Sequence, residues 1–130
     1  MLAVAAGGAV GAVGRYLLTE AFPEPVESFP WTTLAINVSG SFLLALLPAA
    51  AWVRQRDVLP PLLGTGVLGG FTTLSTYSEQ ARALTAAGHA ATAALYVVGT
   101  LAACLVAVAL ADRLSTAPER QEFDDEDGDL

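Results

Sequence analysis

Charged residues are placed so sparsely that they leave long apolar stretches along the chain. The segments Ser28 to Val53, Val58 to Ser78 and Ala83 to Ala111 carry no charge and contain 26, 21 and 29 residues. Each is longer than the roughly 20 residues that cross a hydrocarbon layer about 30 Å thick at about 1.5 Å per residue. A further stretch, residues 2–18, is interrupted only by Arg15. The pattern predicts an all-α membrane protein with four transmembrane helices, at about residues 2–18, 31–53, 60–81 and 90–111.

Short polar or proline-rich segments separate these stretches. Residues 19–30 contain three prolines and three glutamates, Arg54 to Asp57 form a charged connection, and Arg82 to Gly88 lead into the last stretch. Short connections place consecutive helices side by side and antiparallel, so residues 1–111 are predicted to form one transmembrane domain. Pro48 lies inside the second predicted helix and is expected to bend it, because proline removes a helical hydrogen bond.

The formal charge of −7 belongs to the end of the chain. Residues 112–130 carry eight acidic residues and two arginines, whereas residues 1–111 carry five acidic residues and four arginines. An acidic segment with so little apolar surface repels itself and cannot form a core, which predicts a disordered tail over 112–130. The chain has no lysine and no basic face, so nucleic-acid binding is not expected.

The arginines are distributed unevenly between the two sides of a four-helix topology. The side that holds both termini carries four of them, Arg54, Arg56, Arg113 and Arg120. The other side carries Arg82 and, at the end of the first helix, Arg15. Because cytoplasmic loops of membrane proteins are enriched in basic residues, this bias predicts a multi-pass protein of the plasma membrane with both termini in the cytoplasm.

Two of the predicted helices carry a stripe of polar side chains. Thr33, Asn37 and Ser41 follow one another at intervals of four in the second helix. The fourth helix repeats this spacing with Thr92, Tyr96, Thr100 and Cys104. Polar groups gain nothing from lipid contact, so both stripes are expected to face protein or an ion path. Asn37 is the most informative of them, because its amide offers two N–H donors to an anion and one oxygen to a neighbouring hydroxyl.

The third predicted helix contains the strongest signal in the sequence. Gly69 and Gly70 are followed closely by a run of hydroxyl residues that extends from Thr72 to Ser78. Such a run weakens the helix, and irregular backbone at membrane depth is tolerated only where it is buried in protein or lines a wet cavity. We therefore predict a break near mid-membrane. Its carbonyls could hold a cation, and the side chains that follow, Ser75, Thr76 and Tyr77, could face an anion.

The first predicted helix combines small residues with one charge. Gly7, Gly11 and Gly14 lie on one face, which lets another helix approach closely. Arg15 carries a permanent charge in a bilayer segment, which requires an aqueous anchor, a vestibule that attracts anions, or a structural contact at a dimer centre. The sequence alone leaves these three roles open.

The composition of these faces excludes most classes of enzyme. No paired carboxylates, no Ser-His-Asp set and no metal-binding cluster are present in the pattern, so the chain is not expected to be an enzyme. A lining of neutral hydrogen-bond donors suits a small, strongly hydrated anion. Two other classes compete: a proton-coupled exporter, for which Glu79 is the sole candidate membrane carboxylate, and a membrane scaffold, which leaves the donor stripes unexplained.

Three motifs resemble the CrcB/Fluc family of fluoride channels. They are residues 8–16 (GAVGAVGRY), 33–42 (TLAINVSGSF) and 69–78 (GGFTTLSTYS), and the likeness covers all four predicted helices. The resemblance implies a passive fluoride exporter built as an antiparallel, inverted dimer with two pores. It implies a structural sodium ion held at the dimer interface by the backbone carbonyls of Gly69 and Thr72. It also assigns Asn37 to the pore and Ser75 and Thr76 to a hydroxyl track, with Tyr96 as the neighbour of this track on the fourth helix.

The chain departs from the family pattern at two positions. The family motif usually reads Thr-Thr-Phe-Ser-Thr-Phe, with both phenylalanines along the fluoride path, whereas this chain has Leu74 and Tyr77. The first aromatic ring is lost and the second gains a hydroxyl. Besides a homodimeric channel, the sequence therefore allows a weakly conducting or non-conducting subunit of a heterodimer, whose similar partner supplies the missing ring.

Overall fold

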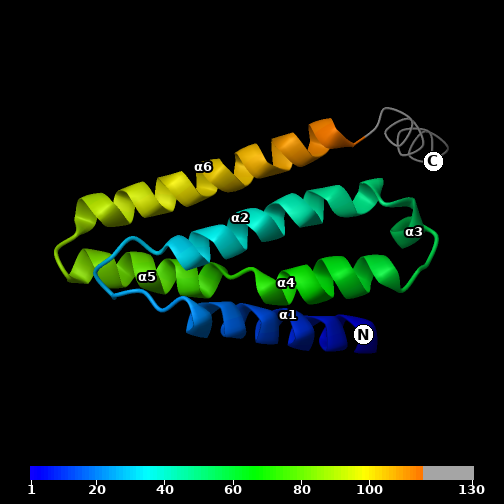
Figure 1. Cartoon of the computed structure of the whole chain (residues 1–130), viewed down its shortest axis with the longest axis horizontal. Helices are drawn as coiled ribbons and strands as arrows, with labels where there is room; N and C mark the ends of the chain where they lie inside the picture. Colours follow the sequence, from blue (N-terminus) through cyan, green and yellow to red (C-terminus); the bar gives the residue numbers. More distant parts are fainter. Residues whose placement is uncertain (116–130) are drawn as a thin grey trace.

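The computed structural model describes residues 1–115, and every regular element in this part of the chain is helical (Figure 1). The elements are α1 (Leu2–Ala21), α2 (Trp31–Leu46), the 3-10 turn η1 (Leu47–Ala49), α3 (Ala51–Arg54), the π-helical segment η2 (Pro61–Leu68), α4 (Gly69–Phe71), α5 (Leu74–Ala86) and α6 (Ala90–Leu114). Three helices are long and apolar enough to cross a membrane, over Leu2–Ala21, Trp31–Ala49 and Ala90–Leu114. Residues 1–115 are thus helical throughout their regular elements, as in a helical membrane protein.

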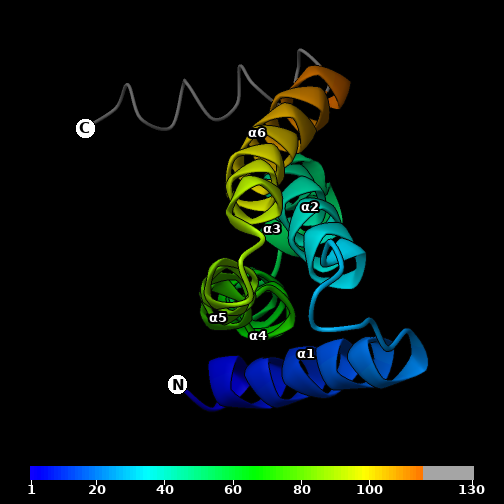
Figure 2. The same cartoon turned by 90° about the vertical axis from the view of Figure 1, so that its left-hand side faces the viewer.

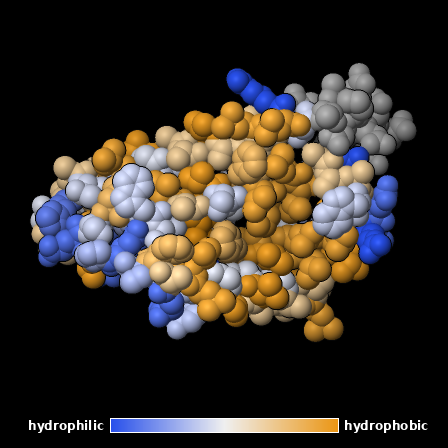
Figure 3. All heavy atoms as spheres, in the orientation of Figure 1, coloured by the Kyte–Doolittle hydropathy of each residue, from blue (hydrophilic) through white to orange (hydrophobic). Residues whose placement is uncertain are grey.

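Helices α4 and α5 follow one another along the long axis beside α2 and α6 (Figure 1), whereas α1 crosses α4 at an angle (Figure 2). Helix α1 packs against η2 and α4, while α6 packs against α2 and α5. Both the amino terminus and the end of α6 lie at the same end as α3 in Figure 1. Hydrophilic residues gather at the two ends and hydrophobic residues cover the middle (Figure 3), as expected for helices that cross a hydrocarbon layer.

The glycine face of α1 makes its closest contacts. A Cβ atom at Gly7 would collide with the Leu62 backbone of η2. A Cβ atom at Gly11 would collide with the backbone of Val67 in η2 and of Phe71 in α4. Gly70 of α4 approaches the backbone of Gly8 equally closely. The prediction that this face lets another helix approach is confirmed for Gly7 and Gly11, whereas Gly14 has only ordinary contact with a side chain.

The second predicted helix ends earlier than 53. Its α-helical part stops at Leu46, Pro48 lies in the turn η1, and Ala50 is extended with ψ 99° before α3 begins. Proline cannot donate to the carbonyl one turn back, so the chain tightens and then breaks instead of merely bending. At the other end, Glu24 in the preceding loop accepts a 3.0 Å hydrogen bond from the Thr32 amide and so caps the start of α2.

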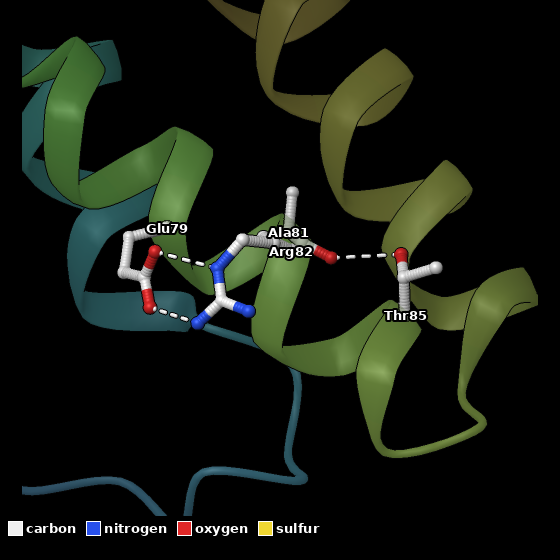
Figure 4. Close-up of polar contacts among 4 residues, drawn as sticks. All are labelled: Glu79, Ala81, Arg82 and Thr85. Atoms are coloured by element: carbon white, nitrogen blue, oxygen red, sulfur yellow. Dashed lines mark hydrogen bonds and ion pairs between the residues drawn. The ribbon is translucent and has the colours of Figure 1, made fainter.

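The other predicted helices were too short at their carboxyl ends. Helix α1 continues to Ala21, α5 to Ala86 and α6 to Leu114, against predicted ends at 18, 81 and 111. The polar residues there favour helix: Glu79 and Arg82, three positions apart, form an ion pair on the surface of α5, and the hydroxyl of Thr85 bonds back to its own helix (Figure 4). Of the predicted tail, residues 112–114 are helical, and residues 116–130 lie outside the described part of the chain.

Candidate ion pathway

The helical backbone is interrupted between α4 and α5. Thr72 (φ −74°, ψ 158°) and Thr73 (φ −149°, ψ 121°) are extended, so the chain leaves the helix at Phe71 and re-enters it at Leu74. The amide of Thr72 still donates to Leu68 O, as does its hydroxyl, both at 3.0 Å. The Thr73 hydroxyl accepts from the Thr76 amide at 3.1 Å and caps α5. The location of this interruption at mid-membrane stays a prediction.

Asn37 of α2 holds this interruption in place. Its Oδ1 accepts from the Thr73 amide at 2.8 Å, and its Nδ2 donates to the Thr73 carbonyl at 3.0 Å. The side chain therefore replaces the hydrogen bond that the Thr73 amide would make in a continuous helix, and it adds a donor to the carbonyl with which α5 begins. The amide oxygen, which the sequence offered to a neighbouring hydroxyl, accepts from a backbone amide here. One N–H of Nδ2 remains for a further acceptor.

Hydroxyl groups cluster around the same residue. The Thr73 hydroxyl lies 3.2 Å from that of Ser75 and 3.1 Å from that of Thr76. Two residues predicted to line an anion path are thus gathered at the start of α5 around Thr73, which is buried in the protomer. These hydroxyls also bond to one another, so their donors are shared between the cluster and any ion nearby.

An open groove of about 280 Å³ lies beside the interruption. Its lining comes from α2, α5, α6 and the interruption itself, and consists of Asn37, Ser41, Leu44, Thr72, Thr73, Leu74, Tyr77, Thr100, Leu101 and Cys104. The structure thus brings together four of the predicted pathway residues: Asn37, Leu74, Tyr77 and Thr100. Of these, Thr100 is only 3% exposed, and its hydroxyl has no hydrogen-bond partner in residues 1–115. A buried hydroxyl without a partner is costly and marks a place for a ligand or water.

Tyr96, also predicted to line the pathway, lies outside the groove. It is fully buried beside Leu84 and Ala93, and its hydroxyl donates to Gln80 Oε1 at 2.9 Å. Its ring contacts Tyr77 at 5.1 Å between ring centres. In this protomer Tyr96 supports the groove wall from behind.

Arg15 reaches the carboxyl end of α4. Its Nε donates to the Gly70 carbonyl at 3.3 Å. This contact is made within a single protomer, and the three roles that the sequence left open for Arg15 stay predictions. The contact supplies a donor to a carbonyl that the interrupted helix leaves without its helical partner.

Two neighbouring carbonyls lose their helical donors in the same region. The amide that would serve Gly69 O belongs to Thr73 and is bound by Asn37, and the amide that would serve Thr72 O belongs to Thr76 and is bound by the Thr73 hydroxyl. These are the two carbonyls that the family resemblance assigns to sodium. In residues 1–115 there is no cluster of three or more His, Cys, Asp or Glu side chains for a metal.

Comparison with known proteins places this arrangement in a family. Residues 2–111 match the family described as CrcB-like protein, Camphor Resistance (CrcB). The chain belongs to the CrcB family. This match includes every residue that lines the groove and the interruption.

Relatives of this CrcB protein carry names that state an ion. The Fluoride-specific ion channel FluC 2 of Nocardia farcinica is 42% identical over 113 residues, covering 85% of this chain and 80% of the relative. FluC of Anaeromyxobacter sp. is 43% identical over 112 residues, covering 82% and 87%. FluC 3 of Streptomyces avermitilis is 46% identical over 113 residues, covering 85% of this chain and 55% of the relative. This chain therefore spans about half the length of that last protein.

Sequence reasoning missed two residues that hold the groove and its surroundings in place. Thr73, on which Asn37 and the hydroxyl cluster converge, sits just before a helical run, which is the position of a capping residue, and this signal could have identified it. Gln80, the partner of the Tyr96 hydroxyl, gave no such signal, because only the packing of α5 against α6 brings it there.

Proposed function

We propose that this chain is a subunit of a fluoride-specific channel, which lets cytoplasmic fluoride leave the cell passively and lowers its toxicity. One observation carries the proposal: a groove with a buried, unpartnered hydroxyl at Thr100 lies beside a helix interruption held by Asn37. The names of the relatives agree with it. This function is that of a channel and not of an enzyme.

The chemistry of the groove suits a small anion. The remaining N–H of Asn37 and the hydroxyl of Thr100 are neutral donors, and no carboxylate lines the groove. Neutral donors replace part of the hydration shell of an anion without trapping it by a full opposite charge. A fluoride ion, small and strongly hydrated, gains most from such short hydrogen bonds.

Passive movement is favoured over proton coupling. A proton-coupled exporter needs a carboxylate inside the membrane that loses and regains its proton. Glu79, the candidate from the sequence, is exposed, lies outside the groove and is paired with Arg82 at 2.6 Å. It is thus already engaged by a charge of opposite sign.

The segment from η2 to α5 is proposed to be the fourth membrane crossing, broken near mid-membrane. It runs alongside α2 and α6 (Figure 1), although the interruption divides it into halves that are individually short. A pair of such subunits in inverted orientation would form the channel, because the groove is open on one side in a single protomer. The termini are proposed to lie in the cytoplasm.

A sodium ion between the two subunits is also proposed. The carbonyls of Gly69 and Thr72 fit a sodium ion, because the amides that would bind them in a continuous helix donate to Asn37 and Thr73 instead. Two carbonyls from each of two copies would give four oxygen ligands, and neutral oxygens suit a hard cation. When bound, the ion would neutralise carbonyl dipoles that otherwise repel one another.

The position of Leu74 favours a second candidate, a partner subunit in a heterodimer. Leu74 lines the groove but is 76% exposed in the protomer, and no aromatic ring stands there. A similar four-helix subunit with phenylalanine at this position would supply the ring. The choice between homodimer and heterodimer decides whether this chain conducts fluoride alone.

Fluoride efflux from liposomes tests the proposal. Purified protein is reconstituted with potassium fluoride inside, and release is followed with a fluoride electrode after a potassium ionophore is added. Rapid fluoride release with chloride retained is expected, either from this chain alone or after a similar subunit is added. Comparable release of both ions, or no release under either condition, would contradict the assignment.

A further inference from the structure

The chain has a single thiol, and this thiol lies on the wall of the groove. Cys104 is the only cysteine in the sequence, and it is free and partly exposed. It lines the groove from α6, together with Ser41 of α2 and Tyr77 of α5. The groove therefore offers one soft ligand atom, the Sγ of Cys104, among hydroxyl, amide and apolar groups.

The residue one helical turn before Cys104 shows that this part of the groove takes a ligand. Thr100 also lines the groove and is almost fully buried, and its hydroxyl has no hydrogen-bond partner in residues 1–115. A buried hydroxyl without a partner marks a place for water or an ion. Residues four positions apart lie on the same face of a helix. Water or ions that reach Thr100 therefore also come close to the Cys104 sulfur.

We propose that Cys104 is a binding site for a soft monovalent metal cation, the class to which Cu(I) and Ag(I) belong, and that the bound cation closes the groove. The inference rests on the fluoride channel proposed above. Thiolate is the form of cysteine that binds metals, and soft cations prefer it. The S–H bond of Cys104 breaks, an S–metal bond forms and the proton passes to water, with no change in oxidation state.

The composition of the groove favours this class of metal over others. Its lining contains no carboxylate for a hard cation and no second cysteine or histidine for Zn²⁺, which takes four ligands. A soft monovalent cation is satisfied by the thiolate and one water molecule. That water can bind the Thr100 hydroxyl, so the groove loses this donor as well as the space that the metal fills.

Silver is the probe, because silver fluoride is soluble and Ag⁺ is stable in water. Wild type, with a cysteine-free partner subunit if one is required, is reconstituted with potassium fluoride inside, and silver nitrate is added on both sides in chloride-free buffer. Fluoride release is expected to fall at least about tenfold at saturating silver and to recover when an excess of a small thiol removes the metal. Zn²⁺ at the same concentration is expected to leave the release unchanged.

Two variants locate the site, each compared with its own release in the absence of silver. Cys104→Ser replaces the sulfur by oxygen, so silver is expected to lower its release less than about twofold. Cys104→Ala serves if this variant does not fold. Cys104→Ser combined with Leu105→Cys is the matched control, because Leu105 is 62% exposed and lies outside the groove. Its thiol lies at nearly the same depth, and silver is expected to leave the release of this double variant unaffected.

A second readout does not depend on transport. After desalting in detergent, elemental analysis should find one silver ion per wild-type chain, matching its one cysteine, and none on Cys104→Ser. Equal block of wild type and Cys104→Ser, or block of the double variant with Leu105→Cys, would overturn the inference and leave the channel assignment standing. Wild type that releases no fluoride, with or without a partner, would overturn the channel assignment, and the silver count would then decide the binding site alone.

Discussion

The side chain of Asn37 binds the backbone of Thr73, which lies 36 positions further along the chain. Both polar ends of the amide bond to Thr73, at 2.8 and 3.0 Å, and only one N–H is left for an ion. The side chain is thus both a structural support of the interruption and a part of the groove. A substitution at Asn37 is expected to affect stability and transport together.

Asn37→Asp tests this double role. The carboxylate can still accept from the Thr73 amide, but it removes both N–H donors, turns an oxygen toward the Thr73 carbonyl and places negative charge in the groove. We expect fluoride efflux to fall at least about tenfold and the free energy of unfolding to fall by about 1–3 kcal/mol. Efflux and thermal unfolding in detergent measure the two effects. Ser39→Ala is the control, because its hydroxyl bonds only within α2. Normal efflux from Asn37→Asp would remove Asn37 from the pathway.

The candidate site was predictable to the extent that periodicity defines a face. Spacing in α2 and α6 selected Asn37 and Thr100, and both line the groove. The same spacing selected Tyr96, which points instead into the core formed with Leu84. A helical face is wide enough to touch both a groove and a core, so periodicity does not separate them. The two hydrogen bonds from Asn37 to Thr73 depend on the three-dimensional path of the interrupted chain, which no local sequence pattern predicts.

At the scale of the elements, α1 is held against η2 and α4 by the absence of side chains. Gly7 and Gly11 stand where any Cβ would meet backbone atoms, whereas a Cβ at Gly8 would have nothing within 4 Å. Backbone cannot give way as a flexible side chain does. These three glycines of α1 therefore differ in whether they tolerate a side chain: Gly7 and Gly11 do not, and Gly8 does.

Gly8→Ala and Gly11→Ala form a matched pair on this helix. Gly11→Ala is expected to lower the free energy of unfolding by about 1–3 kcal/mol, because α1 must move away from Val67 and Phe71. Gly8→Ala is expected to raise it by about 1 kcal/mol, because alanine is the better helix former. Thermal unfolding in detergent micelles measures both. Equal destabilisation by the two variants would show that this packing does not govern the stability of α1.

The elements themselves could be located from charge-free stretches, but their ends could not. Polar residues such as Arg82 and Thr85 read as a loop, yet they extend α5 because their partners lie on the same helix. Pro48 was expected to bend a helix and instead ends it within a residue or two. Hydropathy predicts which residues lie in the hydrocarbon layer. Helix ends depend instead on local hydrogen bonds, which continue into the polar layer beyond it.

At the scale of the whole molecule, a substitution at Gly69 can distinguish contacts within one protomer from contacts between two copies. A Cβ there would meet only the carbonyl of Gly64, at an ordinary 3.8 Å, so the protomer has room for it. In the proposed dimer, a second copy and a cation at the Gly69 carbonyl would leave no room for that Cβ. The space around Gly69 thus provides a test of the proposed sodium site and dimer.

Gly69→Val is expected to leave the helical content unchanged and to weaken the dimer. In sodium-containing buffer the wild type should run as a dimer on size exclusion with light scattering, and the variant as a monomer or a mixture. Replacing sodium by a large organic cation should dissociate the wild type in the same way. Gly99→Val is the matched control, because a Cβ at Gly99 also has open space in the protomer. A stable dimer of Gly69→Val that does not depend on sodium would remove the site.

The distribution of arginines between the two ends of the molecule indicates how it is oriented in the membrane and whether its partner is a second copy or a different subunit. The amino terminus, α3 with the neighbouring connection, and the end of α6 lie together at one end (Figure 1), so Arg54, Arg56 and Arg113 share that side. Arg82 lies near the end of α5 at the opposite side and is offset by Glu79. A subunit that forms an inverted dimer with itself must insert in both orientations, which requires nearly balanced charge. The imbalance and the leucine at position 74 together favour a fixed orientation and a separate, oppositely inserted partner.

Reporters that are active on only one side of the membrane test this orientation when fused to the carboxyl terminus. A cytoplasmic signal alone is expected, because three arginines lie on that side against Arg82 and Arg15 on the other. Fluoride efflux should then be weak from this chain by itself and rise when a similar subunit with phenylalanine at the position of Leu74 is added. Arg54→Glu together with Arg56→Glu should shift part of the signal to the outer side, since it removes most of the bias. Equal signals from both sides in the unaltered chain, with full efflux and no partner, would show that it forms its own inverted dimer.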